Sequence, residues 1–249
     1  MSVKSAERSL RIFELLAGHP EGLTVQEIAR LLSYPQSSTL GLVRTLHEEG
    51  YLHQFGSKQY KLGPRLIQLG FMAMEALDVA ALGKPHLAAL MEVTQETVFM
   101  SVLSQGQLVY VAKMDSNRSI RTAAQPGARR PLYCTGLGKA FLAFMPEEER
   151  QALLAEMSLI PLTGHTITSR ERLEEELRGF RELGYAVDNE ESEEGLYCLA
   201  APVRGAGGQL QAAVSVAGPK ERMASRQGQI ATELLKAVDA ISRSLGYWG

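Results

Sequence analysis

A run of polar side chains near the N-terminus has the types and spacing to recognise nucleic acid. Ser33-Tyr34-Pro35 breaks the chain, and proline suits the start of the helix predicted over 36–49. A helix fits the major groove of DNA, where polar side chains near its N-terminus reach base edges and N–H groups hold phosphate. The same residue types also cap helices, and this alternative stays open. The side chains that would contact DNA are Gln36, Ser37, Ser38, Thr39 and Arg44.

A second group of residues could bind an anion. Thr135-Gly136-Leu137-Gly138-Lys139 leads into an apolar segment that is predicted to be a helix over 136–145. Exposed N–H groups at a helix N-terminus, together with the helix dipole, attract negative charge. The GxxxxGK[ST] spacing of a P-loop is absent. The alternative is a turn that packs closely against a sheet.

The two cysteines are candidates for a nucleophile. Cys134 or Cys198 could attack a substrate with a histidine as base. The five histidines are scattered, and no group of residues suggests a catalytic triad or a metal site. They are His19, His47, His53, His86 and His165. We therefore expect no catalytic residue, metal or cofactor.

The elements that must position these residues begin with three helices and a hairpin. Apolar spacing predicts helices over 5–17, 24–32 and 36–49, then strands over 51–55 and 59–62. Thr24-Val25-Gln26-Glu27 is a capping box, and Gly50 suits the end of the third helix. That helix would place Leu40, Val43 and Leu46 on one face. This order is typical of a winged helix-turn-helix, assigned to residues 1–63.

The remaining residues predict a linker and an α+β domain. Residues 64–80 form the predicted linker helix, and residues 81–249 the second domain, an antiparallel sheet with flanking helices. Its predicted strands are 97–103, 108–114, 120–124, 185–187, 197–203 and 210–217, and its helices 85–94, 136–145, 146–157, 169–183 and 221–245. The linker helix has more apolar surface than its neighbours in sequence can cover, which favours a dimer.

Composition and charge limit the function classes. The net charge is −2, with 7 Lys or Arg against 6 Asp or Glu in residues 1–62. DNA binding needs a local basic face rather than a basic chain, so this balance does not exclude it. Lys58 and Lys61 of the hairpin would meet phosphates, although lysine is also common in soluble turns. No stretch reaches the roughly 18 to 20 apolar residues of a membrane helix, and no signal peptide is evident. The two isolated cysteines fit the reducing cytosol, so we expect a cytoplasmic protein without membrane contact.

Several segments in order carry a family resemblance. They are residues 5–10, 23–29 (Leu-Thr-Val-Gln-Glu-Ile-Ala), 45–52, 131–140 (Pro-Leu-Tyr-Cys-Thr-Gly-Leu-Gly-Lys-Ala), 184–191, 198–203 and 215–219. Over nearly the whole chain they resemble the IclR family of bacterial transcriptional regulators. The resemblance implies a winged helix-turn-helix, a linker helix and a GAF-like effector domain. It also implies homodimers or homotetramers that bind palindromic operators in double-stranded DNA.

The resemblance also implies site residues and two departures from the family pattern. Small organic acids or aromatic compounds would be the effectors, with the N–H groups of Gly136 and Leu137 on a ligand carboxylate. The other matched positions are Asp188, Cys198 and Ser215, and the DNA set comprises Thr24, Gln36, Ser37, Ser38, Thr39, Arg44, Lys58 and Lys61. Gly41 stands where the family usually has Arg, and Ala217 where it often has Ser.

Three functions follow from these observations. The first is a DNA-binding regulator controlled by a small acid. Asp188 next to an anion would favour a ligand that has a hydroxyl or a protonated acid group, although Asp188 could also cap a turn and Cys198 could be a small core residue. The second is a regulator whose second domain only oligomerises. The third is a cysteine-dependent enzyme.

Overall fold

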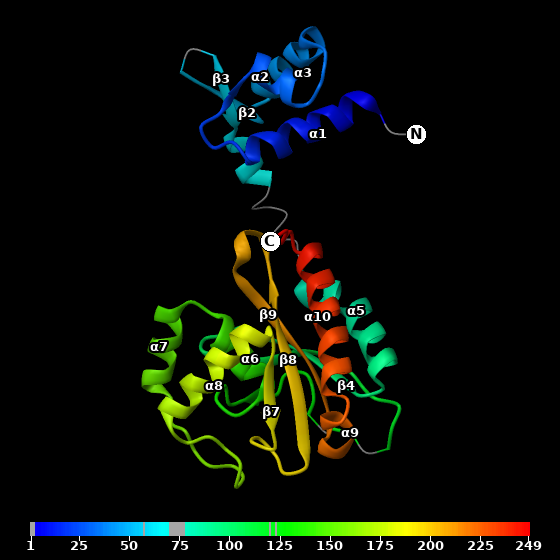
Figure 1. Ribbon diagram of the computed structural model, residues 1–249, viewed down its shortest axis with the longest axis vertical. Coiled ribbons are helices and arrows are strands. Elements are labelled where there is room, and N and C mark those ends of the chain that lie inside the picture. Colours follow the sequence, from blue (N-terminus) through cyan, green and yellow to red (C-terminus); the bar gives the residue numbers. More distant parts are fainter. Residues whose placement is uncertain (1–2, 57, 70–77, 120, 123) are drawn as a thin grey trace. The chain divides into compact units, whose positions relative to one another are not determined.

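The computed structural model describes residues 3–56, 58–69, 78–119, 121–122 and 124–249. The chain folds into two compact units, Met1–Leu77 and Asp78–Gly249 (Figure 1). Each unit has its own sheet and its own buried core. No helix among the described residues is long and apolar enough to cross a membrane.

In the described residues up to Leu62, the first unit contains three helices and a three-stranded antiparallel sheet. The elements are α1 (Lys4–Ala17), β1 (Leu23–Thr24), α2 (Val25–Leu31), α3 (Gln36–Glu48), β2 (Leu52–Phe55) and β3 (Gln59–Leu62). The strand order is β1-β3-β2. This arrangement confirms the predicted winged helix-turn-helix, and β1 is an addition that the apolar pattern did not reveal.

Local sequence explains how the helices of the first unit begin and end. The capping box at α2 is formed: the Glu27 N–H donates to Thr24 Oγ1 at 3.3 Å, and the Thr24 N–H donates to Glu27 Oε2 at 2.7 Å. Gly50 follows α3 with a φ of 78°, in the left-handed region that glycine adopts without strain. The core of this unit consists of Ile12, Leu16, Leu23, Ile28, Val43 and Leu52.

Two predictions for this part of the chain need correction. Leu40 is not on the buried face of α3: its exposed fraction is 53%, whereas Thr39 and Val43 are buried. Positions 39 and 43 lie one turn apart, and the Thr39 hydroxyl can be buried because it donates to the Pro35 carbonyl. The predicted linker helix does not reach Ala80. Residues 64–69 are helical, residues 70–77 lie outside the described ranges, and Asp78 has an extended backbone that caps the next helix.

The second unit contains a six-stranded antiparallel sheet. Its strands are β4 (Thr97–Ser104), β5 (Gln107–Met114), β6 (Arg129–Arg130), β7 (Ala186–Asn189), β8 (Leu196–Arg204) and β9 (Leu210–Pro219). The spatial order is β6-β5-β4-β9-β8-β7. Helices α5 (Val79–Thr94), α9 (Lys220–Ala224) and α10 (Gln227–Ser244) pack on one face, and α6 (Gly136–Phe144), α7 (Glu147–Glu156) and α8 (Arg170–Leu183) lie on the other side (Figure 1).

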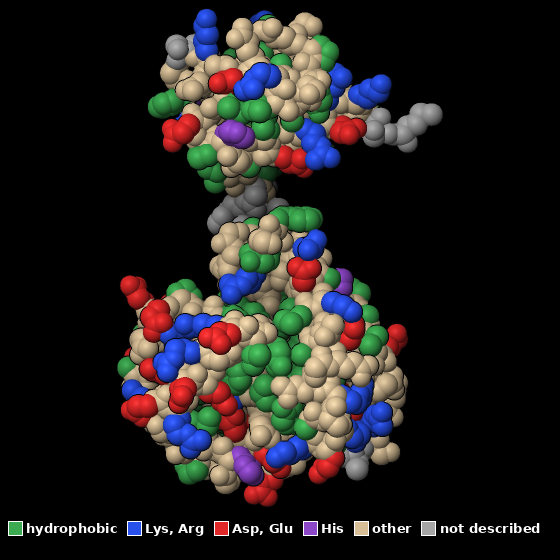
Figure 2. Space-filling model, in the orientation of Figure 1, with side chains coloured by type: hydrophobic (Ala, Val, Ile, Leu, Met, Phe, Trp, Pro, Cys, Tyr) green, Lys and Arg blue, Asp and Glu red, His purple; other side chains and the backbone are tan. Residues whose placement is uncertain are grey.

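Strand alternation divides the core into two layers. In β8, Cys198 and Ala200 belong to the cluster that contains α6, whereas Leu199 and Ala201 belong to the cluster that contains α10. Successive side chains of a strand point to opposite faces, so each strand contributes to both layers. Helix α8 buries Leu173, Leu177 and Phe180, and Figure 2 shows charged side chains of both signs over α7 and α8.

Two predicted elements of the second unit differ from the structure. Residues 121, 122 and 124 are not in a strand, while residues 120 and 123 lie outside the described ranges. The edge strand is β6, which forms because Arg129 and Arg130 pair with Val109 and Leu108. The long helix predicted over 221–245 is two helices, α9 and α10. They are separated at Ser225 and Arg226, where the regular series of helical hydrogen bonds is interrupted.

Candidate functional site

A cavity of about 90 Å³ lies between the sheet and the N-terminus of α6 in the second unit. All five residues predicted to bind an effector line it: Gly136, Leu137, Asp188, Cys198 and Ser215. Asp188 lies on β7, Cys198 on β8 and Ser215 on β9, three neighbouring strands. Their side chains share the face that α6 covers because alternation places them there.

The N-terminus of α6 forms one wall of the cavity. Thr135 caps it: Thr135 Oγ1 accepts the Gly138 N–H at 3.1 Å, and the Thr135 carbonyl accepts the Lys139 N–H at 2.8 Å. The N–H groups of Gly136 and Leu137 precede these bonds and therefore have no partner within the helix. Both are at the positive end of the helix dipole, which favours an anion there.

Glycine is required at this wall for close packing. A Cβ on Gly136 would lie 2.8 Å from Cys198 Sγ, and a Cβ on Gly138 would lie 2.3 Å from the Leu132 carbonyl oxygen. The alternative that these glycines allow tight packing is therefore correct. It is compatible with anion binding, since the same packing brings the helix terminus onto the sheet.

Asp188 both caps a turn and lines the cavity. Its Oδ1 accepts the N–H groups of Glu191 at 2.8 Å and Ser192 at 3.4 Å, and its Oδ2 accepts the Ser192 hydroxyl at 2.5 Å. The side chain is fully buried, and burial raises the pKa of this carboxyl above its ordinary value. A ligand group that donates a hydrogen bond would be favoured at its free lone pairs.

Two buried hydroxyls in the cavity wall lack hydrogen-bond partners among the described residues. They are those of Ser215, which is 1% exposed, and Thr122. A buried polar group without a partner costs roughly 1–3 kcal/mol. Ligands or ordered water commonly satisfy such groups. Ala217 lies in one row with Cys198 and Asp188 across β9, β8 and β7, so the missing family hydroxyl would have faced the same cavity.

The two cysteines are not activated. Burial, reinforced by the negative charge of Asp188, raises the pKa of both Cys134 and Cys198 to about 12. The thiolate is the nucleophile, so both thiols are unreactive near neutral pH. No three His, Cys, Asp or Glu side chains within the described ranges are grouped so as to hold a metal ion.

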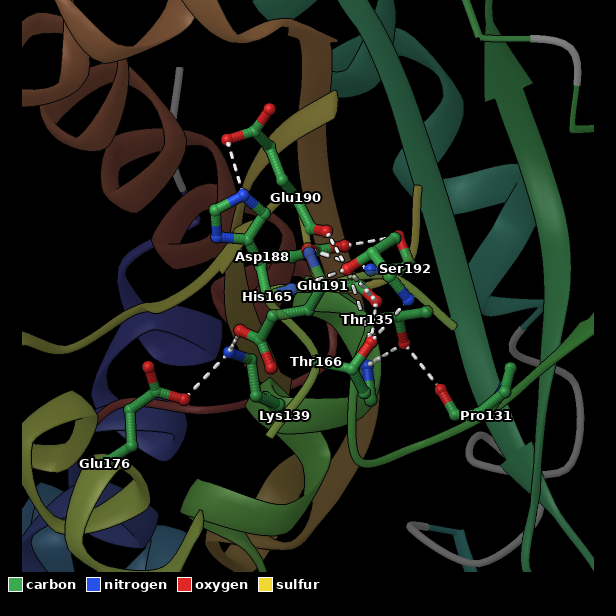
Figure 3. Close-up of polar contacts among 12 residues, drawn as sticks. Pro131, Thr135, Lys139, His165, Thr166, Glu176, Asp188, Glu190, Glu191 and Ser192 are labelled. Carbon is green, nitrogen blue, oxygen red and sulfur yellow. Dashed lines mark hydrogen bonds and ion pairs between the residues drawn. The ribbon is translucent and has the colours of Figure 1, made fainter. Parts of the chain in front are cut away.

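A buried ion cluster supports the cavity wall and was not predicted from the sequence (Figure 3). Lys139 of α6 is fully buried, and its Nζ contacts Glu191 and, at 2.8 Å, Glu176 of α8. Burial raises the pKa of Glu191 to about 7, and the attraction of Lys139 opposes that rise. The Glu191 N–H donates to Asp188, so the cluster connects α6, α8 and the turn that holds Asp188. A lysine inside a glycine loop gave only a weak signal for this arrangement.

Sequence reasoning also missed the aromatic and basic part of the cavity. Phe99 of β4 and Tyr110 of β5 line it, with ring centroids 5.0 Å apart. Arg130 of β6 lines it too. Strand alternation could have pointed to Phe99 and Tyr110, but Arg130 belongs to an edge strand that was not predicted.

In the first unit, part of the predicted DNA set forms an exposed surface on α3. Gln36, Ser37 and Arg44 are exposed, and Arg44 makes an ion pair with Glu48 at 2.8 Å. Ser38 is half-buried and Thr39 fully buried. Both of their hydroxyls donate to the Pro35 carbonyl. The structure therefore does not bring Thr39 to the surface, because its side chain packs inside and supports the helix start.

The remaining DNA candidates are Thr24 and the two lysines. Thr24 is half-buried and occupied by its capping box. Lys58 is exposed after β2, and Lys61 is half-buried with its Nζ 4.7 Å from the Phe55 ring centroid. Gly41 is exposed on α3, and a Cβ there would meet nothing within 4 Å. Packing within the chain therefore does not require glycine at this position.

Comparisons with known proteins cover both units. The family model described as "IclR helix-turn-helix domain" matches residues 5–55, and the one described as "Bacterial transcriptional regulator IclR C-terminal" matches residues 71–243. The chain is 31% identical over 247 residues to the HTH-type transcriptional regulator XynR of Escherichia coli, covering 98% of each. It is 32% identical to KdgR of the same organism, covering 98% of this chain and 94% of that protein.

A solved structure of similar fold covers nearly the whole chain. The crystal structure of Pseudomonas aeruginosa HmgR matches with a TM-score of 0.82 and 28% sequence identity. The match covers 99% of this chain and 100% of that one.

Proposed function

Because the chain belongs to the IclR family of bacterial transcriptional regulators, we propose that a small organic acid bound in its second unit controls how its first unit binds DNA. As a family member the chain is a DNA-binding transcriptional regulator and not an enzyme. The acid effector, its site residues and the oligomeric state are the proposed part.

One observation carries the proposal of an effector. Five positions from three segments of the chain, 136–137, 188–198 and 215, line a single cavity, and one of them, Ser215, carries a buried hydroxyl without a partner among the described residues. The carboxylate of the acid would accept the N–H groups of Gly136 and Leu137. Asp188 would accept a hydroxyl of the ligand, which favours a hydroxy acid.

The DNA contacts are proposed for the exposed part of α3 and for the hairpin. Gln36 and Ser37 would reach base edges, while Arg44, Lys58 and Lys61 would neutralise phosphates. We propose that two first units in a dimer or tetramer bind the halves of a palindromic operator. The effector would change DNA affinity by a coupling free energy of about 1–3 kcal/mol, the range usual for such systems.

The test of effector binding combines a thermal-shift screen of small acids with DNA binding measured by fluorescence anisotropy. The DNA is the fragment upstream of the protein's own gene, and each acid that shifts the melting temperature is then added to the DNA titration. We expect at least one acid to change DNA affinity five- to 150-fold. Ser215→Ala should weaken the binding of that acid. Ser101→Ala is the matched control, since the Ser101 hydroxyl is also buried without a partner in the part of the chain that the structure describes, but does not line the cavity.

A second candidate function is a regulator whose second unit serves only assembly. Ala217 favours it, because alanine removes a hydroxyl that the family often places in the cavity wall. If no acid shifts the melting temperature, and light scattering shows a stable dimer or tetramer that binds DNA, this second function is correct. If the DNA titration shows no salt-sensitive, sequence-dependent binding, the proposed DNA contacts are wrong.

A further inference from the structure

The chemical type of the residues that line the cavity changes in order from one edge of the sheet to the other. In spatial order they are Arg130 on β6, Tyr110 on β5, Phe99 on β4, Ser215 on β9, Cys198 on β8 and Asp188 on β7. The N-terminus of α6 lies over β8, where Gly136 touches Cys198. The cavity wall therefore has a helix terminus near one edge, aromatic rings in the middle and a guanidinium group at the other edge.

The two positive regions belong to different ends of the cavity. β6 and β8 are four strand positions apart, and neighbouring strands are about 4.8 Å apart, so their backbones are separated by about 19 Å before curvature. The arginine side chain and the curl of the sheet shorten this separation. The two positive regions are therefore carried by strands on opposite sides of the two central strands, β4 and β9.

Strand register places Arg130, which is exposed to solvent, on the face of the sheet that lines the cavity. Arg130 pairs with Leu108, whose side chain is fully buried in the core beneath α6, and Tyr110 is on the same face two residues further along β5. Arg130 makes no hydrogen bond or ion pair with the residues that the structure describes. Arg130 and Pro131 also line an open groove of about 450 Å³ beside the cavity, so a ligand can extend toward solvent there.

The acidic groups of the cavity come from other elements than this cation. Asp188 and Glu193, the two carboxylates in the lining, come from β7 and from the turn between β7 and β8. An anionic group next to Arg130 would therefore gain a charge-assisted, planar interaction without a neighbouring carboxylate on the same strand.

We propose that Arg130 binds a second anionic group of the effector, so that the cavity selects an acid with two anionic ends over a monocarboxylate. This inference rests on the proposed function, because the first anionic end is placed at Gly136 and Leu137. The part of the ligand between its two ends lies on Phe99 and Tyr110, which suits a ring or a short methylene chain.

A different role for Arg130 would be protection of the sheet edge. Charged side chains that point inward on edge strands prevent strands of two molecules from pairing. In that case Arg130 would affect aggregation and not ligand selection, and the experiment separates these roles.

The experiment measures dissociation constants by calorimetry on the full-length protein for matched acids. The dianionic probes are adipate and terephthalate, and the monoanionic probes are hexanoate and benzoate. The variants are Arg130→Gln, Arg130→Lys and Arg129→Gln. Arg129→Gln is the matched control, because it removes the same charge from the same two-residue strand, but Arg129 lines only the adjoining groove and not the cavity.

We expect the wild type to bind a dianionic probe at least tenfold more tightly than its monoanionic partner. Arg130→Gln should remove this preference, with a loss of about tenfold or more for the diacid and little change for the monoacid. Arg130→Lys should retain part of it, and Arg129→Gln should retain all of it.

Any of the following results would overturn the inference. An Arg130→Gln protein that keeps the preference, or one that changes only in aggregation, excludes ligand selection by Arg130. Equal losses in Arg129→Gln and Arg130→Gln would mean general attraction of anions and no specific contact. If monoacids bind as tightly as diacids, the inference fails while the proposed acid effector stands. If no acid of either kind binds in calorimetry or in the thermal-shift screen, the proposed acid effector fails and this inference fails with it.

Discussion

Lys139 is a fully buried cation whose removal should destabilise the second unit strongly. Its ammonium group contacts Glu191, whose side chain is 5% exposed, and Glu176, whose side chain is 33% exposed. Lys139→Met keeps a long unbranched side chain but leaves the Glu191 carboxylate buried without its cation. Breaking a buried pair in this way costs about 3–5 kcal/mol. Glu176 contributes little to that figure because water can solvate it.

The loss of stability caused by Lys139→Met should increase with pH. In the wild type the pKa of Glu191 is raised from 4.5 to about 7 by burial. Loss of Lys139 raises it further, since the attraction that opposed burial is gone. The unfolded chain releases this proton near its ordinary pKa, whereas the folded variant retains it, so stability falls as pH rises from about 4.5 through the raised value. The difference between wild type and variant should be small near pH 6 and should grow by about 1.4 kcal/mol for each pH unit above about 7, up to the full cost where the carboxyl of the folded variant ionises.

The assay is urea unfolding followed by far-ultraviolet circular dichroism at both pH values. The transition of the second unit is fitted separately, because two units need not unfold together. Lys139→Met/Glu191→Gln should recover to within about 1 kcal/mol of the wild type, since no unpaired buried carboxylate remains. Lys236→Met is the control, because Lys236 makes an exposed ion pair with Glu233 and its loss should cost less than about 0.5 kcal/mol.

Two results would refute this reasoning about Lys139. One is a difference in stability between wild type and Lys139→Met that does not increase from pH 6 to pH 8. The other is a double variant no more stable than the single one, which would mean that the cost comes from packing and not from the charge of Glu191.

Three further predictions follow from other parts of the structure. Gly41→Ala should raise the stability of the first unit by about 0.5–1 kcal/mol in thermal unfolding, because a Cβ there would meet nothing within 4 Å and alanine favours a helix. Gly41→Arg should tighten DNA binding and make the affinity more dependent on salt. An unchanged affinity would mean that position 41 does not face DNA. Cys134 and Cys198 should not react with a thiol reagent at pH 8 until urea unfolds the protein, because burial raises the pKa of each thiol to about 12. Fast reaction of the folded protein would contradict this prediction. Arg222→Met should destabilise the second unit by about 1–3 kcal/mol, because it removes the bonds of 2.8 and 2.7 Å to the buried carboxylate of Glu96 and leaves the longer contact of 3.8 Å with Arg118. A cost under about 0.5 kcal/mol in the same urea assay would show that Arg118 satisfies Glu96 by itself.

The first unit was predictable because its signals are local. The capping box at Thr24, the break at Pro35 and the glycine at position 50 each fix a helix end through neighbouring residues. The burial of Thr39 in place of Leu40 was not predictable in the same way. A hydroxyl can be buried when it donates to a carbonyl one turn back, and this depends on how α3 packs on the rest of the unit.

The second unit shows where local signals are insufficient. The two-residue strand β6 has no periodicity to detect, and it exists only because β5 offers Leu108 and Val109 as partners. The break between α9 and α10 falls within residues whose composition suits a helix throughout. In both cases tertiary contacts override local preference.

By itself the sequence determined the class of protein, the order of elements and the five positions that line the cavity. Helix caps, turn glycines and apolar periods act over a few residues, and the motifs that resemble the IclR family are continuous segments. Only the tertiary structure decided that Lys139 is buried against Glu176 and Glu191 and that Arg130 shares the cavity with Asp188. These pairs are 37 to 58 positions apart, and only the strand order β6-β5-β4-β9-β8-β7 and the docking of α6 bring them together.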